Sequence, residues 1–234
     1  MSRIEKIYHA AKSDKWIKGF ANFCRYVLAA SFLPTGIAKI SGQRFAEGLP
    51  SNNPLGHYFD ALLQTGYYYT FIGIIQVIVA ILLLIPRTVL LGTIIYFPMI
   101  INICVLTYAT RFAGTRANTM LLLGCIFLLL WSYDRLKYIL PFKQYMKEPA
   151  DPSSLSFRHR TIFFSGVFTV LAIIIAGTAY LYEIGPGNSE AECRNQCYGS
   201  KNPTACEAFC DCIYKEGQSL DRCLATFKEA KDTR

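Results

Sequence analysis

The stretch YYYTFIGIIQVIVAILLLIPRTVLLGTIIYFPMIINICVLTY, residues 67–108, contains two apolar runs, 67–85 and 89–108, joined by only three residues. Each run has about the 20 residues that an α-helix needs to cross a bilayer core of roughly 30 Å. Pro86 cannot continue a helix and forces the chain to turn. The stretch therefore predicts an antiparallel membrane hairpin.

The rest of the chain supports an all-α membrane protein. Of the 234 residues, 53% are hydrophobic, in blocks too long for a soluble domain, which excludes an ordinary soluble enzyme. Three more runs, 19–38, 117–133 and 161–182, bring the expected spans to five. We expect a four-helix transmembrane bundle, a fifth transmembrane helix and a small disulfide-stapled helical tail domain.

Lys and Arg residues flanking the spans predict the orientation. One side holds twelve (Arg3, Lys6, Lys12, Lys15, Lys18, Arg87, Arg135, Lys137, Lys143, Lys147, Arg158, Arg160), and the other holds four (Lys39, Arg44, Arg111, Arg116). The amino end is therefore expected in the cytoplasm and the carboxyl tail in the periplasm, with the chain in a bacterial inner (cytoplasmic) membrane. The first run lacks a signal-peptide cleavage site and is expected to stay as an anchor.

These expectations divide the chain into five parts: a basic cytoplasmic arm (1–18), the bundle (19–140), a cytoplasmic linker (141–160), the fifth span (161–182) and an extracytoplasmic Cys-rich domain (183–234). The arm suits either an amphipathic helix on the inner leaflet or a solvated basic segment. The net charge of +8 is explained by topology and anionic lipid, so no nucleic-acid partner is expected.

Six of the nine cysteines lie in the tail, and Cys24, Cys104 and Cys125 lie in expected spans as packing residues. The tail resembles twin Cys-x3-Cys helical hairpins. That resemblance favours the pairs Cys193–Cys210, Cys197–Cys206 and Cys212–Cys223, although fifteen connectivities are open. In an oxidising compartment disulfides are favoured over zinc, and no metal site is expected.

Polar side chains within the spans mark candidate ligand-binding residues. Gln76 and Asn102 need partners in lipid and are each expected to face another helix or a wet cavity, which should open outward. Tyr69 and Tyr96 are candidate cavity walls, with an interfacial aromatic belt as the alternative for Tyr69. Arg111 and Arg116 are candidate anion or headgroup contacts, or simple exceptions to the charge rule.

Residues 21–140 resemble the DoxX-like family of small membrane proteins. The resemblance is carried by Arg25, Gly36-Ile-Ala-Lys39, residues 73–84, Pro86-Arg87-Thr88 with Leu91-Gly92, and residues 131–137. It implies a four-helix membrane bundle. The family includes subunits of thiosulfate:quinone oxidoreductase, but its second helix often carries an acidic residue where this chain has Gln76.

Three function classes follow. The first is a membrane scaffold or accessory subunit of a cell-envelope complex, not an enzyme on its own, that docks a protein partner through its tail. The alternative is a quinone-linked oxidoreductase subunit, with quinone as its cofactor near Gln76 and Asn102. Binding of a small amphiphile is a third class, and the oligomeric state is open.

Overall fold

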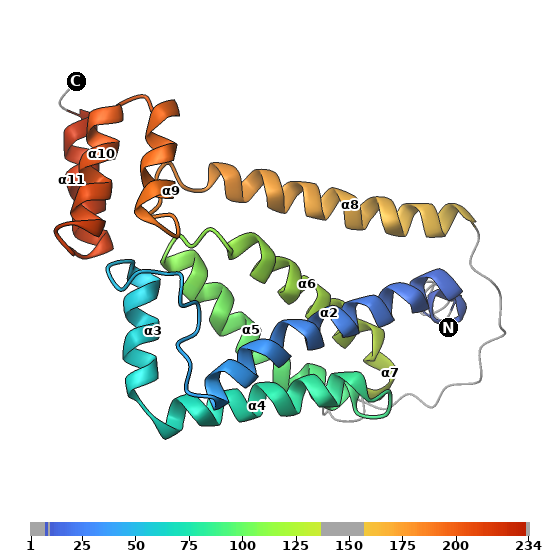
Figure 1. Cartoon of the computed structure of the whole chain (residues 1–234). Coiled ribbons are helices and arrows are strands. Elements are labelled where there is room, and N and C mark those ends of the chain that lie inside the picture. The colour runs from blue at the N-terminus through green and yellow to red at the C-terminus, as the bar shows by residue number, and fades with distance from the viewer. Residues whose placement is uncertain (1–7, 9, 137–156, 233–234) are drawn as a thin grey trace.

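The computed structural model describes residues 8, 10–136 and 157–232, and every regular element within them is a helix (Figure 1). The long helices are α2 (Lys15–Ile40), α4 (Tyr67–Leu84), α5 (Val89–Ala109), α6 (Thr115–Trp131) and α8 (Phe157–Tyr180). The shorter ones are α3 (Pro54–Gln64), α7 (Tyr133–Leu136), α9 (Glu190–Asn195), the 3-10 turn η1 (Gln196–Gly199), α10 (Pro203–Tyr214) and α11 (Leu220–Asp232). Residues 141–156 of the expected linker, and residues 1–7 and 9 of the expected arm, lie outside the described residues.

Within the part of the chain that the structure describes, three helices are long and apolar enough to cross a membrane: Tyr67–Leu84, Val89–Ala109 and Phe157–Thr178. They confirm the hairpin and the last of the expected spans. Helix α6 is apolar but has only 17 residues, and α2 is longer but carries Arg25 in its interior. Membrane crossing by 19–38 and 117–133 therefore stays a prediction.

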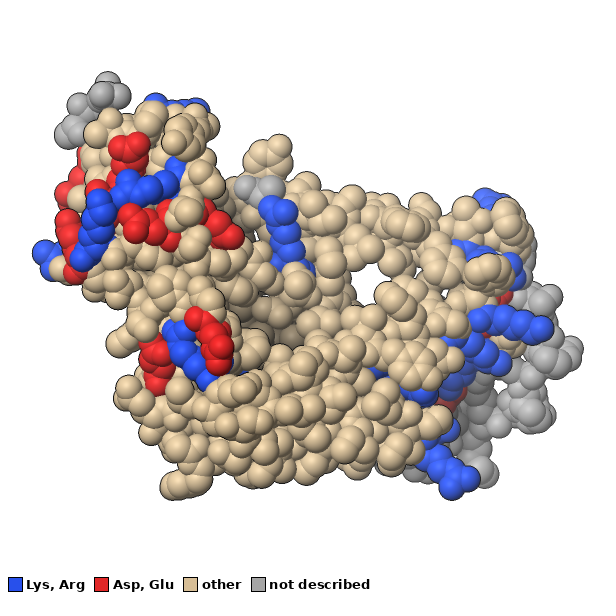
Figure 2. All heavy atoms as spheres, viewed as in Figure 1, with Lys and Arg blue, Asp and Glu red and all other residues tan. Residues whose placement is uncertain are grey.

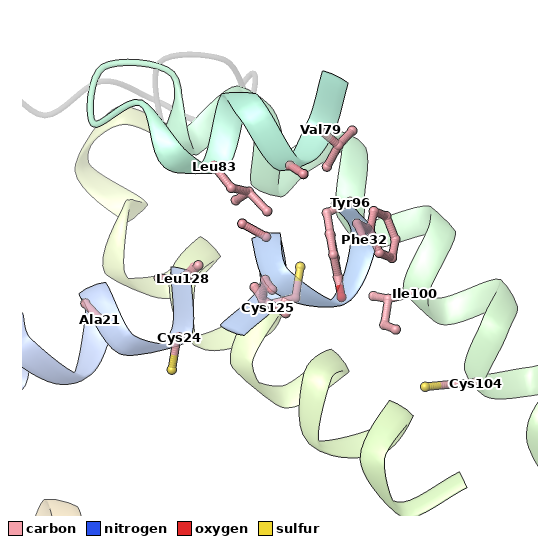
Figure 3. Packing of buried hydrophobic residues seen from close by; sticks show 13 residues of the cluster. Ala21, Cys24, Phe32, Val79, Leu83, Tyr96, Ile100, Cys104, Cys125 and Leu128 are labelled. Carbon is pink, nitrogen blue, oxygen red and sulfur yellow. The ribbon is translucent and has the colours of Figure 1, made fainter. Parts of the chain in front are cut away.

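Helices α2, α4, α5 and α6 form a bundle in which α2 packs on α4 and α6, and α5 packs on the same two helices (Figure 1). Its core is drawn in Figure 3, where the Phe32 and Tyr96 rings lie side by side. Their centroids are 4.0 Å apart in a stacked arrangement. The three cysteines outside the tail are free and buried, as expected for packing residues.

Helices α2 and α4 approach most closely at two glycines. A Cβ atom on Gly36 would lie 2.8 Å from the Gly73 carbonyl oxygen, and one on Gly73 would lie 2.7 Å from the Gly36 carbonyl oxygen. Because real Cβ atoms do not come this close to backbone oxygen, only glycine permits this crossing. Small residues at a helix crossing are the usual device for close packing in membranes.

Helix α8 stands apart from the bundle. None of its apolar window is buried, and Figure 2 shows openings between it and the other helices. It contacts α6 and the start of α2, where the Phe163 ring lies 5.8 Å from that of Phe20. Arg160 forms an ion pair of 2.8 Å with Asp14, whose side chain also caps α2. These contacts fix the first turns of α8.

Charged side chains gather at the two ends of the molecule. In Figure 2, acidic and basic residues cover the Cys-rich domain, Lys and Arg cluster near the amino terminus, and the surface between is almost free of both. An uncharged band between charged ends is the pattern that a bilayer requires of the surface it surrounds. The distribution agrees with the membrane helices.

Helices α9, α10 and α11 form the Cys-rich domain. Its disulfides are Cys193–Cys210, Cys197–Cys206 and Cys212–Cys223, which are the three expected pairs. The six sulfurs are the centre of a small core that also includes Phe209, Ile213 and Phe227. A domain this small gains much of its stability from such bonds.

Candidate functional site

Helix α4 turns a stripe of small and polar residues toward the bundle interior. Tyr69, Gly73, Gln76 and Ala80 recur at three- and four-residue spacing, and all four are buried. A helix places residues at this spacing on one face. The stripe is therefore an internal surface, although its members have different surroundings.

Tyr69 lies in the first turn of α4. Its hydroxyl donates a hydrogen bond of 2.8 Å to the Gln43 carbonyl oxygen and accepts one of 2.9 Å from the Phe45 amide. The side chain is 1% exposed. Tyr69 therefore joins α4 to the chain that follows α2, and its hydroxyl is fully occupied by that role.

Tyr96 and Gln76 lie deeper in the bundle. The Tyr96 hydroxyl lies 3.0 Å from the Ser31 hydroxyl, within hydrogen-bond distance. Gln76 packs against Gly36 and is 4% exposed, and its Oε1 atom has no hydrogen-bond partner among the described residues. A buried amide oxygen without a donor costs free energy, so Gln76 is the one of the six candidates with unused hydrogen-bonding capacity inside the bundle.

Asn102 does not face the interior, so that expectation is wrong. Its side chain is exposed, whereas Ile100 and Cys104 of the same helix are buried. Two positions along an α-helix correspond to a rotation of about 200°, which places Asn102 on the face opposite to its buried neighbours. The structure therefore does not bring Asn102 and Gln76 to one site.

Arg111 and Arg116 both have partners within the chain. Arg111 donates a hydrogen bond of 2.7 Å to the Ile184 carbonyl oxygen, and its guanidinium lies 4.7 Å from the centre of the Tyr182 ring. Arg116 donates one of 2.9 Å to the Thr178 hydroxyl. Arg111 thus joins the loop between α5 and α6 to the chain that follows α8, and Arg116 joins the start of α6 to the last turns of α8. The binding of a ligand by either arginine stays a prediction.

A second set of contacts holds the Cys-rich domain on the loop between α2 and α3. Asn53 donates hydrogen bonds to the Gly187 carbonyl oxygen (2.8 Å) and the Tyr214 hydroxyl (3.3 Å), and Asn52 donates one of 2.9 Å to the Tyr214 carbonyl oxygen. The Tyr214 hydroxyl donates in turn to the Pro186 carbonyl oxygen. Burial raises the pKa of Tyr214, although the hydrogen bond with Asn53 opposes this. The hydroxyl therefore stays protonated near neutral pH.

Sequence reasoning did not identify this contact. Asn52 and Asn53 precede Pro54, and this pattern is typical of a turn before a helix. The structure agrees, since Asn53 caps α3. Nothing in the local pattern indicates a bond to a residue more than 160 positions away.

Three of the tail sulfurs, those of Cys197, Cys206 and Cys210, lie within 4.8 Å of one another, as metal ligands do. All three belong to disulfides, and two neighbouring disulfides account for the proximity. Metal binding requires thiolates, so the oxidised domain offers no such ligands at this position.

The fold and these contacts define an all-helical protein with membrane-spanning helices and a disulfide-bonded domain. The chain is 36% identical over 132 residues to the uncharacterized protein YwoB of Bacillus subtilis (strain 168), a match that includes 54% of this chain and 82% of YwoB. The chain belongs to the same family as YwoB, which is the shorter of the two proteins. No family model and no solved structure matches it.

Proposed function

We propose that this protein is a membrane scaffold or accessory subunit of a cell-envelope complex, with five spans, a cytoplasmic amino end and an external Cys-rich domain that docks a protein partner. The observation that supports this proposal most strongly is the rigidity of the Cys-rich domain. Three disulfides crosslink it internally, and the hydrogen bond between Asn53 and Tyr214 fixes it to the loop between α2 and α3. A domain fixed in this way presents one constant surface to a partner, which lowers the entropic cost of binding.

The architecture supports separate roles for the four-helix bundle and for α8 with the Cys-rich domain. The DoxX-like resemblance covers only the bundle, and the match to the shorter YwoB has a length comparable with it. Helix α8 adds little to the bundle core, since its apolar window is not buried. Its role in the proposal is to carry the chain back to the outer side, where the Cys-rich domain folds in an oxidising compartment.

An exposed aromatic side chain on the Cys-rich domain offers a place to test docking. Tyr198 in η1 is 90% exposed. Tyrosines are frequent anchors of protein interfaces because they bury a large area at low entropic cost. Tyr180, at the end of α8, is 89% exposed and provides a control of equal exposure outside the domain.

The test replaces Tyr198 or Tyr180 with a photo-crosslinking amino acid and irradiates intact cells. The proposal expects a discrete crosslinked protein of constant mass from position 198, lost under conditions that reduce the disulfides, and none of that mass from position 180. Equal crosslinking at both positions, or none at 198, would argue against docking through this domain.

A quinone-linked subunit is the second candidate, and the buried Oε1 atom of Gln76 favours it. An amide oxygen accepts hydrogen bonds, so it suits the hydroxyl of a quinol better than the carbonyl of a quinone. This candidate expects Gln76→Leu to abolish retention of the quinol through purification under reducing conditions. Asn102→Leu, on the outer face of α5, is the matched control, and unchanged retention in Gln76→Leu would remove this candidate.

A further inference from the structure

The end of the bundle nearest the amino terminus contains a cavity of about 170 Å³, at the opposite end from the Cys-rich domain. Its walls come from the amino-terminal arm, α2, the turn after α4 and the end of α6. Three of the lining residues are cationic, namely Lys12, Arg25 and Arg135, and none is acidic. Figure 2 shows that Lys and Arg cluster at this end of the molecule.

Arg25 is the central element of this cavity. The sequence is compatible with an arginine that extends to the lipid headgroups, but the structure buries the residue to 9% exposure. One of its terminal nitrogens donates a hydrogen bond of 3.0 Å to the Tyr26 hydroxyl, while Nε has no hydrogen-bond partner among the described residues. No carboxylate of the described residues forms an ion pair with Arg25. A buried guanidinium without an anion is destabilising, and an anion in the cavity would offset that cost.

Other polar side chains that line the cavity are also suited to bind an anion. Asn22 and Ser132 line the cavity beside Arg135, and each offers a hydrogen-bond donor. Lys12 already forms an ion pair of 2.8 Å with Asp134. Arg25 and Arg135 are therefore the two lining cations for which the structure gives no acidic partner within the described residues.

We propose that this cavity binds a phosphoryl group, with Arg25 as the principal ligand and Arg135 and Ser132 as supporting donors. Guanidinium groups bind phosphate oxygens through paired, charge-assisted hydrogen bonds, which a lone ammonium cannot form. The phosphoryl group comes either from an anionic phospholipid of the inner leaflet or from free phosphate. The site is separate from the outer surface proposed for docking and does not depend on it.

Trp131 lines the cavity and provides a direct probe. The chain has two tryptophans, so Trp16→Phe leaves Trp131 as the only one. In this background, purified protein in neutral detergent is titrated with inorganic phosphate, and separately with mixed micelles containing phosphatidylglycerol or phosphatidylcholine. Saturable change in Trp131 fluorescence and a raised melting temperature report binding to the folded state.

Three variants test the assignment of the ligand group. Arg25→Gln removes the charge, and Arg25→Lys keeps the charge but loses the paired geometry. Arg87→Gln removes an exposed charge from the same end of the bundle, outside the cavity. We expect a loss of affinity of roughly tenfold or more in both Arg25 variants, and a change within about twofold in Arg87→Gln. If Arg25→Gln does not fold, Arg135→Gln takes its place with the same expected direction.

The titrations with inorganic phosphate and with phosphatidylglycerol distinguish the two sources of the phosphoryl group. A response to inorganic phosphate indicates a site for a free anion, whereas a response to phosphatidylglycerol alone indicates a headgroup site. Equal responses in the Arg25 and Arg87 variants would overturn the proposal. So would the absence of a saturable response to both inorganic phosphate and phosphatidylglycerol.

Discussion

Asn53 and Tyr214 lie 161 positions apart in the chain, yet the Asn53 amide donates a hydrogen bond of 3.3 Å to the Tyr214 hydroxyl. The other end of the same amide, Oδ1, accepts hydrogen bonds from the Leu55 and Gly56 amides at the start of α3. One side chain, 1% exposed, therefore both caps helix α3 and holds the Cys-rich domain against the start of that helix.

The two roles of Asn53 can be separated by substitution. Asn53→Ser keeps a good helix cap but loses the donor that reaches the Cys-rich domain. We expect the free energy that holds the Cys-rich domain against the start of α3 to fall by about 1–3 kcal/mol, because buried acceptors are left unpaired. Hydrogen exchange should show reduced protection of residues 183–189 and unchanged protection of α4 and α5. Unchanged protection of 183–189 would show that the contact contributes little.

The disulfide pairing can be checked chemically. Non-reducing peptide mapping should recover Cys193–Cys210, Cys197–Cys206 and Cys212–Cys223. Replacing Cys212 and Cys223 together by serine should destabilise the Cys-rich domain by about 2–4 kcal/mol, because the unfolded chain regains the freedom of the closed loop. The matched control is Cys24→Ser, which alters a free cysteine outside the domain. Recovery of other pairs would contradict the described core.

The close crossing of α2 and α4 predicts a selective effect of one methyl group. Gly73→Ala places a Cβ atom 2.7 Å from the Gly36 carbonyl oxygen, so the helices must move apart at a cost of about 1–3 kcal/mol. Gly166→Ala in α8 has nothing within 4 Å of its Cβ atom and should leave stability unchanged or slightly raised. Denaturation in mild detergent compares the two, and equal effects would show that the crossing is looser than described.

The ion pair between Asp14 and Arg160 predicts a pH dependence. Burial raises the pKa of Asp14, but hydrogen bonds from Arg160 and from the Ile17 and Trp16 amides outweigh this and hold the pKa below its ordinary value of 3.8. The attachment of α8 is thus fully present above pH 3.8 and is lost as pH falls through the lower, folded-state pKa.

A double-cysteine crosslink between the start of α8 and α2 measures this attachment. Its yield should fall in acid in the native chain and be low at every pH in Arg160→Gln. A yield with the same pH profile in both proteins would assign the dependence to other groups.

The orientation can be tested with two exposed positions at opposite ends of α4. Gly48→Cys lies in the loop between α2 and α3, where an added Cβ atom meets nothing within 4 Å, and Arg87→Cys lies in the turn after α4. A membrane-impermeant maleimide should label position 48 in intact cells and position 87 only after permeabilisation. The reverse pattern would invert the proposed topology.

Local patterns in the sequence were sufficient for much of the fold. The apolar runs predicted α4 and α5 to within one residue at each end, because length, hydrophobicity and Pro86 all act locally. The Cys-x3-Cys spacing led to the right disulfides, since cysteines four apart share a helix face.

Features that depend on the far end of the chain were missed. The cost of an amide in lipid favours an interior position for Asn102, but α5 packs on α4 and α6 through the face of Ile100 and Cys104, which leaves Asn102 on the opposite face. Arg111 bonds to Ile184, and Arg25 is enclosed by residues from α6 and the amino-terminal arm. Each outcome depends on segments that meet only after folding, which periodicity and charge counting do not report.

The central claim is that the Cys-rich domain docks a partner protein. Native mass spectrometry of the assembly, released gently from its own membrane, tests it most directly when the full chain is compared with a chain ending at Tyr182. We expect a stoichiometric partner mass on the full chain and none on the shortened chain, whose bundle still resists detergent. A partner retained by the shortened chain, or a full chain that carries only lipid or quinone, would contradict it.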